Sequence, residues 1–346
     1  MTPKERAFFI KAGIVLLDNF ASLFTSTLLH GIFVLLFTIS TTIIIISPPL
    51  SPSSHSRRGL TVNTKARLAS LLITTLTFLL ASIWWASFIA TLAIEIRTWF
   101  VGIHRGRFTA AQVAAVTRRL YALAQVQSVV TYILPIINDG VVIWRAWALF
   151  AERRWVMILP LALLLGTTAT SSAYIALYTY PATFKAAMEG RVTTQMAIAR
   201  FSIACMSLSF LTNVVTTSLV AAKLLQVLSL PSIPPRNRYL TPDAHKIKQL
   251  APQRVMLLLV ESGAFYCVLQ MSFGIMEVLP ASRGSALRIA GRTVFAAFFE
   301  ISAMLPAFVV VLVHRQRSFV ETYGYGNGAA VDFDPGERAL ASVREG

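Results

Sequence analysis

Seven long apolar runs are the feature that most limits what this chain can fold into. A helix that crosses a bilayer needs about 20 mostly apolar residues, because each residue rises about 1.5 Å through about 30 Å of hydrocarbon. Barrel strands are much shorter and alternate in polarity, so runs of this length predict helices. The runs are Ala21–Ile46, Leu68–Ile94, Leu120–Leu149, Val156–Tyr178, Phe201–Leu225, Val255–Val278 and Val294–Val313. The sequence therefore predicts an all-α, polytopic membrane protein, a seven-transmembrane-helix bundle.

These runs divide the chain into three parts. We expect an interfacial lead-in over residues 1–20, the helix bundle over residues 21–313 and a cytosolic tail over residues 314–346. The lead-in is apolar, but Lys11 interrupts it and Asp18 closes it. The tail is rich in glycine and then acidic, which is typical of disordered segments. No small-residue cleavage site follows a short apolar segment, so we expect the first span to be an uncleaved anchor.

The composition agrees with a membrane protein and argues against a soluble one. Hydrophobic residues make up 55% of the 346 residues and charged residues 13%, whereas soluble domains carry about 25% charged residues. The formal net charge of +16 can indicate nucleic-acid binding. In a chain this apolar, basic loops that lie against anionic lipid headgroups explain the charge better. We therefore expect the lipid bilayer as a partner, and no nucleic acid.

The distribution of basic residues predicts the orientation in the membrane. With the N-terminus outside, the cytosolic segments hold 17 of the 31 Lys and Arg residues and the opposite segments hold 14. The positive-inside rule therefore favours an outside N-terminus and a cytosolic C-terminus. The basic segment Lys223–Arg254 would then meet a cytosolic partner or anionic lipid. We expect the plasma membrane rather than an internal membrane.

Polar residues inside the spans are candidates for function, because ionisable groups are costly in hydrocarbon. Asn213 falls near the predicted middle of its span, and three acidic residues fall within a few turns of that depth: Asp139, Glu261 and Glu300. If their helices face a common interior, these side chains form a polar pocket for a cationic ligand, an ion or a proton. The alternative is that the acids are protonated and hydrogen-bond between helices, which contributes about 1–2 kcal/mol at most. The sequence leaves both interpretations open.

The stretch from Asn138 to Trp147 is the most distinctive part of the third span. Asn138 is a neutral polar neighbour of Asp139. Trp144 and Trp147 lie near the predicted membrane interface, where indole rings commonly anchor a helix. Arg145 lies about one turn from the end of the span, where its stem can reach the headgroups. Contact with headgroups and a latch to a neighbouring helix both fit that position.

Known catalytic and cofactor patterns do not occur in the sequence. The five histidines are scattered, and His30 is the one that lies within a span, so we expect no metal site built on clustered ligands. There is no H-E-x-x-H, G-x-S-x-G or P-loop pattern. The last span has no lysine for a retinal chromophore and no Asn-Pro-x-x-Tyr of rhodopsin-like receptors. We expect a protein that is not an enzyme and that carries no cofactor.

Several short runs follow one another in a characteristic order over most of the chain. They are Leu29–Phe33, Asn138–Trp147, Arg154–Pro160, Thr212–Thr217, Glu261–Tyr266, Pro306 and Arg317–Phe319. Their order and spacing resemble a large, uncharacterised family of seven-span membrane proteins from mushroom-forming (basidiomycete) fungi. The resemblance implies seven helices and an outside N-terminus, and it supplies no activity, catalytic residue or ligand. The chain departs from the family at His30, where a tyrosine is expected.

Three functions fit these observations. The first is a non-enzymatic, receptor-like protein that senses a small or lipid-soluble ligand, with the four polar residues of the spans at its pocket; this rests on analogy with other seven-helix proteins. The second is a transporter, or a proton or ion pathway, in which the same acids carry charge. The third is a structural or scaffold protein of the membrane.

Overall fold

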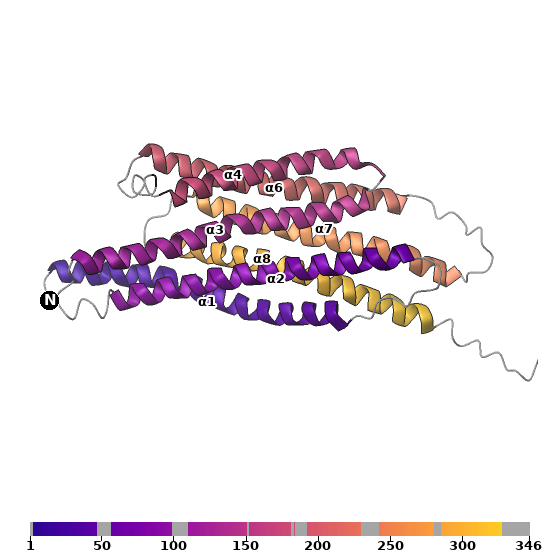
Figure 1. The fold of residues 1–346 in the computed structure, drawn as a ribbon, viewed down its shortest axis with the longest axis horizontal. Helices are drawn as coiled ribbons and strands as arrows, with labels where there is room; N and C mark the ends of the chain where they lie inside the picture. Colours follow the sequence, from indigo (N-terminus) through magenta and orange to yellow (C-terminus); the bar gives the residue numbers. More distant parts are fainter. Residues whose placement is uncertain are drawn as a thin grey trace, which may run out of the picture.

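The computed structural model describes residues 3–46, 57–98, 110–150, 152–180, 183, 192–229, 242–279 and 285–326. Within these residues, long α-helices follow one another along the chain. They are α1 (Pro3–Ile46), α2 (Arg57–Ile96), α3 (Ala110–Leu149), α4 (Ile158–Thr179), α6 (Val192–Ser229), α7 (Pro242–Val278) and α8 (Ala286–Gly326). A short 3-10 helix, η2 (Arg154–Met157), precedes α4. The helices lie side by side in one elongated bundle (Figure 1).

The described residues contain seven segments that are long and apolar enough to cross a membrane. They are Asn19–Ile46, Arg67–Ile96, Ala114–Leu149, Arg154–Thr179, Val192–Ser229, Met256–Val278 and Ala286–Leu312. Each of them overlaps one of the seven runs predicted from the sequence. The fold class is therefore confirmed as an all-α, seven-helix bundle of a multi-pass membrane protein.

All the membrane-spanning helices except α4 are longer than the apolar runs that predicted them. α3, for example, has 40 residues, which corresponds to about 60 Å of helix against about 30 Å of hydrocarbon. α1 begins at Pro3, so the expected lead-in is helical and continuous with the first span. α8 runs on to Gly326, so helix covers the first part of the expected tail, and the rest of that tail lies outside the described residues. An apolar run marks the part of a helix that can lie in hydrocarbon. The backbone hydrogen bonds of the helix continue beyond that part.

α8 lies at the centre of the packing. It contacts α1, α2, α3 and α7, and 56% of the residues in an apolar 18-residue stretch of it are buried, against 17–33% in the corresponding stretches of the other six. One core cluster joins Phe33 of α1, Trp84 of α2, Leu134 of α3 and Phe299 of α8. Large apolar side chains cover the outer surface, as expected for helices that face lipid.

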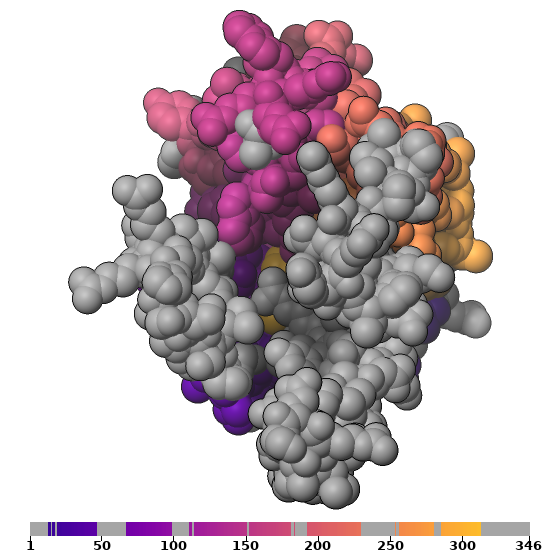
Figure 2. Space-filling view, turned by 90° about the vertical axis from the view of Figure 1, so that its right-hand side faces the viewer, coloured from indigo at the N-terminus to yellow at the C-terminus, as the bar shows by residue number. Residues whose placement is uncertain are grey.

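Successive helices alternate in direction, which gives the bundle two distinct ends. α1, α3, α6 and α8 begin at one end, called here the N-terminal end, and α2, α4 and α7 finish there (Figure 1). Figure 2 looks onto the opposite, C-terminal end, where the magenta to salmon residues of α3, α4 and α6 lie above the purple residues of α1 and α2. Sites between the helices are therefore described below by the end to which they lie closer.

Candidate functional site

Asp139 lies at the centre of a buried polar network between α3, α6 and α7. Its Oδ1 accepts hydrogen bonds from Ser209 Oγ (3.0 Å) and Asn213 Nδ2 (2.8 Å). Ser209 Oγ in turn accepts one from Gln270 Nε2 (2.9 Å). Ser209 and Asn213 are four residues apart on α6, so both side chains face α3. The structure thus joins two of the predicted residues, Asp139 and Asn213, by a direct hydrogen bond.

Several polar atoms of this network have no hydrogen-bond partner. Asn138 donates from Nδ2 to the backbone carbonyl of Ser302 on α8 (3.0 Å). In the described part of the chain, the buried side-chain atoms without a hydrogen-bond partner are Asn138 Oδ1, Asp139 Oδ2, Asn213 Oδ1, Tyr266 OH, Gln270 Oε1 and Ser302 Oγ. Leaving one such atom unsatisfied costs about 1–3 kcal/mol. The unsatisfied oxygens belong to residues of the Asp139 network and to two residues next to Asn138, namely Tyr266 and Ser302.

A small cavity adjoins this network on the side of the C-terminal end. Its volume is about 50 Å³, and Asn138, Asn213 and Tyr266 are among the residues that line it. One water molecule requires roughly 10–15 Å³ by this measure, so the cavity holds a few waters or a partly hydrated ion. Arg145 lines its far side and is half-buried. Among the residues that the structure describes, Arg145 has no hydrogen-bond or ion-pair partner.

A much larger cavity, called here the vestibule, lies on the N-terminal side of the network. Its volume is about 750 Å³, and side chains of α2, α3, α4, α6, α7 and α8 line it. Tyr132 OH donates to Ser202 Oγ (2.7 Å), and the Tyr132 ring packs on Tyr174 with centroids 3.8 Å apart. Met206, another lining residue, lies three residues before Ser209 on α6. The vestibule therefore ends within about one helical turn of the Asp139 network.

Charged side chains lie where the vestibule meets the N-terminal end. Glu277 and Arg292 are among its lining residues. Arg292 Nη1 donates to Asn19 Oδ1 of α1, and Asn19 Nδ2 donates to Glu95 Oε2 of α2 (2.8 Å). This chain of contacts ties α8 to α1 and α2 beside the vestibule. Asn19 and Glu95 were not predicted as site residues, because both lie at the ends of apolar runs rather than inside them.

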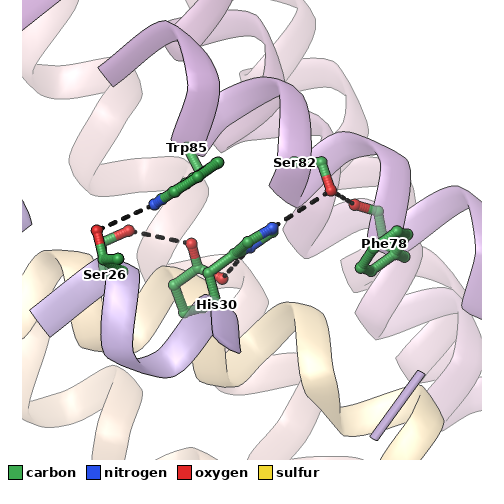
Figure 3. Close-up of polar contacts among 7 residues, drawn as sticks. Ser26, His30, Phe78, Ser82 and Trp85 are labelled. Atoms are coloured by element: carbon green, nitrogen blue, oxygen red, sulfur yellow. Dashed lines mark hydrogen bonds and ion pairs between the residues drawn. The ribbon is translucent and has the colours of Figure 1, made fainter. Parts of the chain in front are cut away.

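Glu300 belongs to a second buried network, between α1, α2 and α8. It accepts a hydrogen bond from Ser26 Oγ (3.1 Å), and its Oε2 lies 3.4 Å from His30 Nδ1. The other ring nitrogen, His30 Nε2, lies 3.4 Å from Ser82 Oγ. The His30 ring also stacks on Trp85, with centroids 4.9 Å apart, so that it lies between Trp85 and Ser82 (Figure 3). Within the described residues, no side-chain hydrogen bond joins this network to that of Asp139.

Glu261 lies in neither network. Its side chain is exposed on the outer surface of α7, as is that of Phe265 one turn further on. Trp144 and Trp147 are also on the outer surface, with 43% and 37% of their side chains exposed. That position fits interface anchors, and the latch that we considered for Arg145 stays a prediction. The four residues expected at one pocket thus occupy three places, because depth along a helix does not determine the direction that a side chain faces.

Several residues of these networks were not recognised in the sequence, although signals for them exist. Ser209 precedes Asn213 by four residues and so shares its helix face. Gln270 is an amide inside the sixth apolar run, where polar side chains need partners. His30 lies within a span, which makes it a functional candidate on the same grounds.

Comparison of the chain with protein-family models, with curated proteins and with solved structures gives no match. The resemblance to a fungal seven-span family therefore stays a prediction.

Proposed function

We propose that this chain is a receptor-like, non-enzymatic membrane protein that binds a small or lipid-soluble molecule in the vestibule. The observation that carries the proposal is the cavity of about 750 Å³ to which six helices contribute side chains. Ligand pockets in proteins usually measure about 300–1,000 Å³. A ligand in contact with so many helices can favour one arrangement of them over another, which is what a receptor requires. The lining combines aromatic rings, hydroxyl groups and charges, which suits an amphipathic molecule.

The Asp139 network has a supporting role in this proposal. Asp139, Asn213 and Gln270 connect α3, α6 and α7 directly beneath the vestibule. Asn138 extends the connection to α8. A change in helix packing around a bound ligand would therefore reach these hydrogen bonds first. Asp139 and Asn213 act here as buttresses of the pocket, and Glu300 as a buttress between α1 and α8.

Filling the vestibule is expected to weaken ligand binding while the protein stays folded. Ala124→Trp places an indole ring among the lining residues of α3. Protein in nanodiscs would be screened by thermal shift against a defined panel of long-chain alcohols, fatty acids and aromatic amines. We expect at least one compound to stabilise the natural protein, and Ala124→Trp to weaken its binding at least tenfold.

The matched control places the same ring on the lipid-facing surface. Leu165→Trp adds an indole to an α4 position that is 71% exposed, so binding should be unchanged. Binding that persists equally in Ala124→Trp would place the ligand outside the vestibule.

The alternative is a transporter, or a proton or ion pathway. The position of Asp139 between two cavities favours it, because a carried charge needs access from both ends. Proteoliposomes would then show a proton or substrate flux that Asp139→Asn removes and the exposed Glu261→Gln leaves intact. Such a flux would replace the receptor proposal. A scaffold protein would show neither flux nor ligand binding, and both substitutions would change stability alone.

The receptor proposal also requires a particular orientation. The vestibule lies at the N-terminal end, so a ligand from outside the cell reaches it when the N-terminus is outside. We expect an N-terminal epitope to be accessible in intact cells at the plasma membrane. An epitope at the C-terminus and one within Lys223–Arg254, the segment proposed to meet a cytosolic partner or anionic lipid, should be reached only after permeabilisation. Both termini on one side of the membrane would contradict this orientation.

A further inference from the structure

The polar side chains around Asp139 share an imbalance that their own hydrogen bonds do not resolve. Asn138, Asn213 and Gln270 each donate from the amide nitrogen to a neighbour and leave the amide oxygen without a partner. Asp139 likewise uses Oδ1 and leaves Oδ2 without a partner. The result is a group of buried oxygens, contributed by α3, α6 and α7, that have no hydrogen-bond partner in the described part of the chain.

Two hydroxyl groups complete the set. Tyr266 OH lies beside the side chains of Asn138 and Ser302, and neither hydroxyl has a hydrogen-bond partner. Every residue that contributes one of these oxygens is at most 6% exposed. A species that accepts lone pairs from several oxygens at once would satisfy the group.

We propose that these oxygens form a binding site for a monovalent cation, with Na⁺ the best fit. Hard cations are bound by carboxylate, amide and hydroxyl oxygens, and the set contains no imidazole or thiolate that would favour a transition metal. Asp139 is the single acid in the set, so one positive charge neutralises it. A divalent ion would leave a net charge buried among the helices, which is costly.

The surroundings are compatible with a cation. The cavity of about 50 Å³ shares Asn138, Asn213 and Tyr266 with the group, so it offers room for an ion and accompanying waters. Arg145 is the charged residue among those that line this cavity. It lies six residues from Asp139, about 9 Å along α3, and forms no ion pair with it. Within the described residues, therefore, no cationic side chain pairs with the Asp139 carboxylate, and Arg145 disfavours entry of a cation from the C-terminal end.

A bound cation would connect helices that the hydrogen bonds already bring together. Its ligands would come from α3, α6, α7 and α8, so it would stabilise the arrangement beneath the vestibule. The inference is independent of the organic ligand, because it depends on the buried oxygens alone. It can be tested on the protein without knowledge of what the vestibule binds.

The test is binding of radioactive ²²Na⁺ to the purified full-length chain in nanodiscs. We expect saturable binding that choline does not compete for, and at least tenfold weaker binding in Asp139→Asn, which keeps the shape of the side chain and removes its charge. Glu261→Gln removes an exposed carboxylate of the same bundle and serves as the matched control. The natural protein should also unfold at a higher temperature in NaCl than in choline chloride at equal ionic strength.

A second variant protects the test against misfolding of the first. Ser302→Ala removes one unpartnered oxygen and leaves the backbone carbonyl that accepts from Asn138. It should unfold as the natural protein does in choline chloride and bind Na⁺ several-fold more weakly. Equal stabilisation by NaCl and choline chloride together with no saturable ²²Na⁺ binding would overturn the proposal and leave water as the occupant. Undiminished binding in a folded Asp139→Asn would overturn it as well.

Discussion

Gly263→Ala is expected to destabilise the protein by about 1–3 kcal/mol, the usual cost of overpacking an interior. A Cβ atom at position 263 would lie 3.0 Å from Thr217 Cγ2 and closer still to Thr217 Oγ1. α6 and α7 therefore approach each other at a point where only glycine fits without a shift. Unfolding can be followed with a maleimide dye that reacts with Cys205, which is buried, in a Cys267→Ser background.

Gly274→Ala on the same helix is the matched control. A Cβ atom there meets nothing within 4 Å, so the gain in helix propensity should leave stability unchanged or raise it by up to about 1 kcal/mol. Thr217→Ala should restore part of the stability lost in Gly263→Ala, because it removes both of the closest atoms. Equal unfolding temperatures for Gly263→Ala and the natural protein would show that α7 moves away freely.

This close approach also explains how the polar network forms. Tyr266 and Gln270 follow Gly263 by three and seven residues, so they lie on the same face of α7. Gln270 reaches Ser209 on α6 with a hydrogen bond of 2.9 Å. If α7 moved away from α6, both side chains would leave the group of oxygens around Asp139.

Glu300→Ala is expected to cost about 2–4 kcal/mol of stability, because truncation opens a buried space and leaves polar partners unsatisfied. Glu300 is fully buried and contacts Ser26 (3.1 Å) and His30 (3.4 Å) on α1. The His30 ring is held against Trp85 by stacking, so it cannot turn away easily to find water. The same dye assay measures the loss.

Two further variants distinguish the effect of the buried Glu300 contacts on stability from the effect of removing a negative charge. Glu300→Gln keeps the size of the side chain and an oxygen for Ser26, so we expect a loss of only about 1 kcal/mol. Glu261→Ala removes an exposed carboxyl group and should change stability by less than about 0.5 kcal/mol. A loss in Glu261→Ala as large as that in Glu300→Ala would mean that the assay reports charge rather than the buried contact.

Much of the fold could be predicted from the sequence. The seven runs predicted seven helices correctly, because a long apolar segment satisfies its backbone groups in lipid only as a helix. The depth of Asp139 and Asn213 in the membrane could also be predicted, since the rise per residue is constant along a helix. Two of the four predicted pocket residues do meet, as a hydrogen-bonded pair.

The tertiary structure decided which faces meet. Glu261 and Tyr266 lie on one helix at similar depth, yet Glu261 is exposed and Tyr266 is 2% exposed. The apolar runs are apolar nearly all round, so the sequence contains little information about how each helix is rotated in the bundle. Helix lengths beyond the hydrocarbon were likewise not predicted.

Sequence by itself thus determined the number, order and depth of the spans, because these depend on local hydrophobicity. Only the tertiary structure shows the contact of Glu300 with His30, the unpartnered oxygens of the Asp139 network and its neighbours, and the vestibule. These features require side chains from helices far apart in the chain to point at one another. Which helix faces meet is determined by close contacts such as that of Gly263 with Thr217, and these contacts depend on the whole bundle.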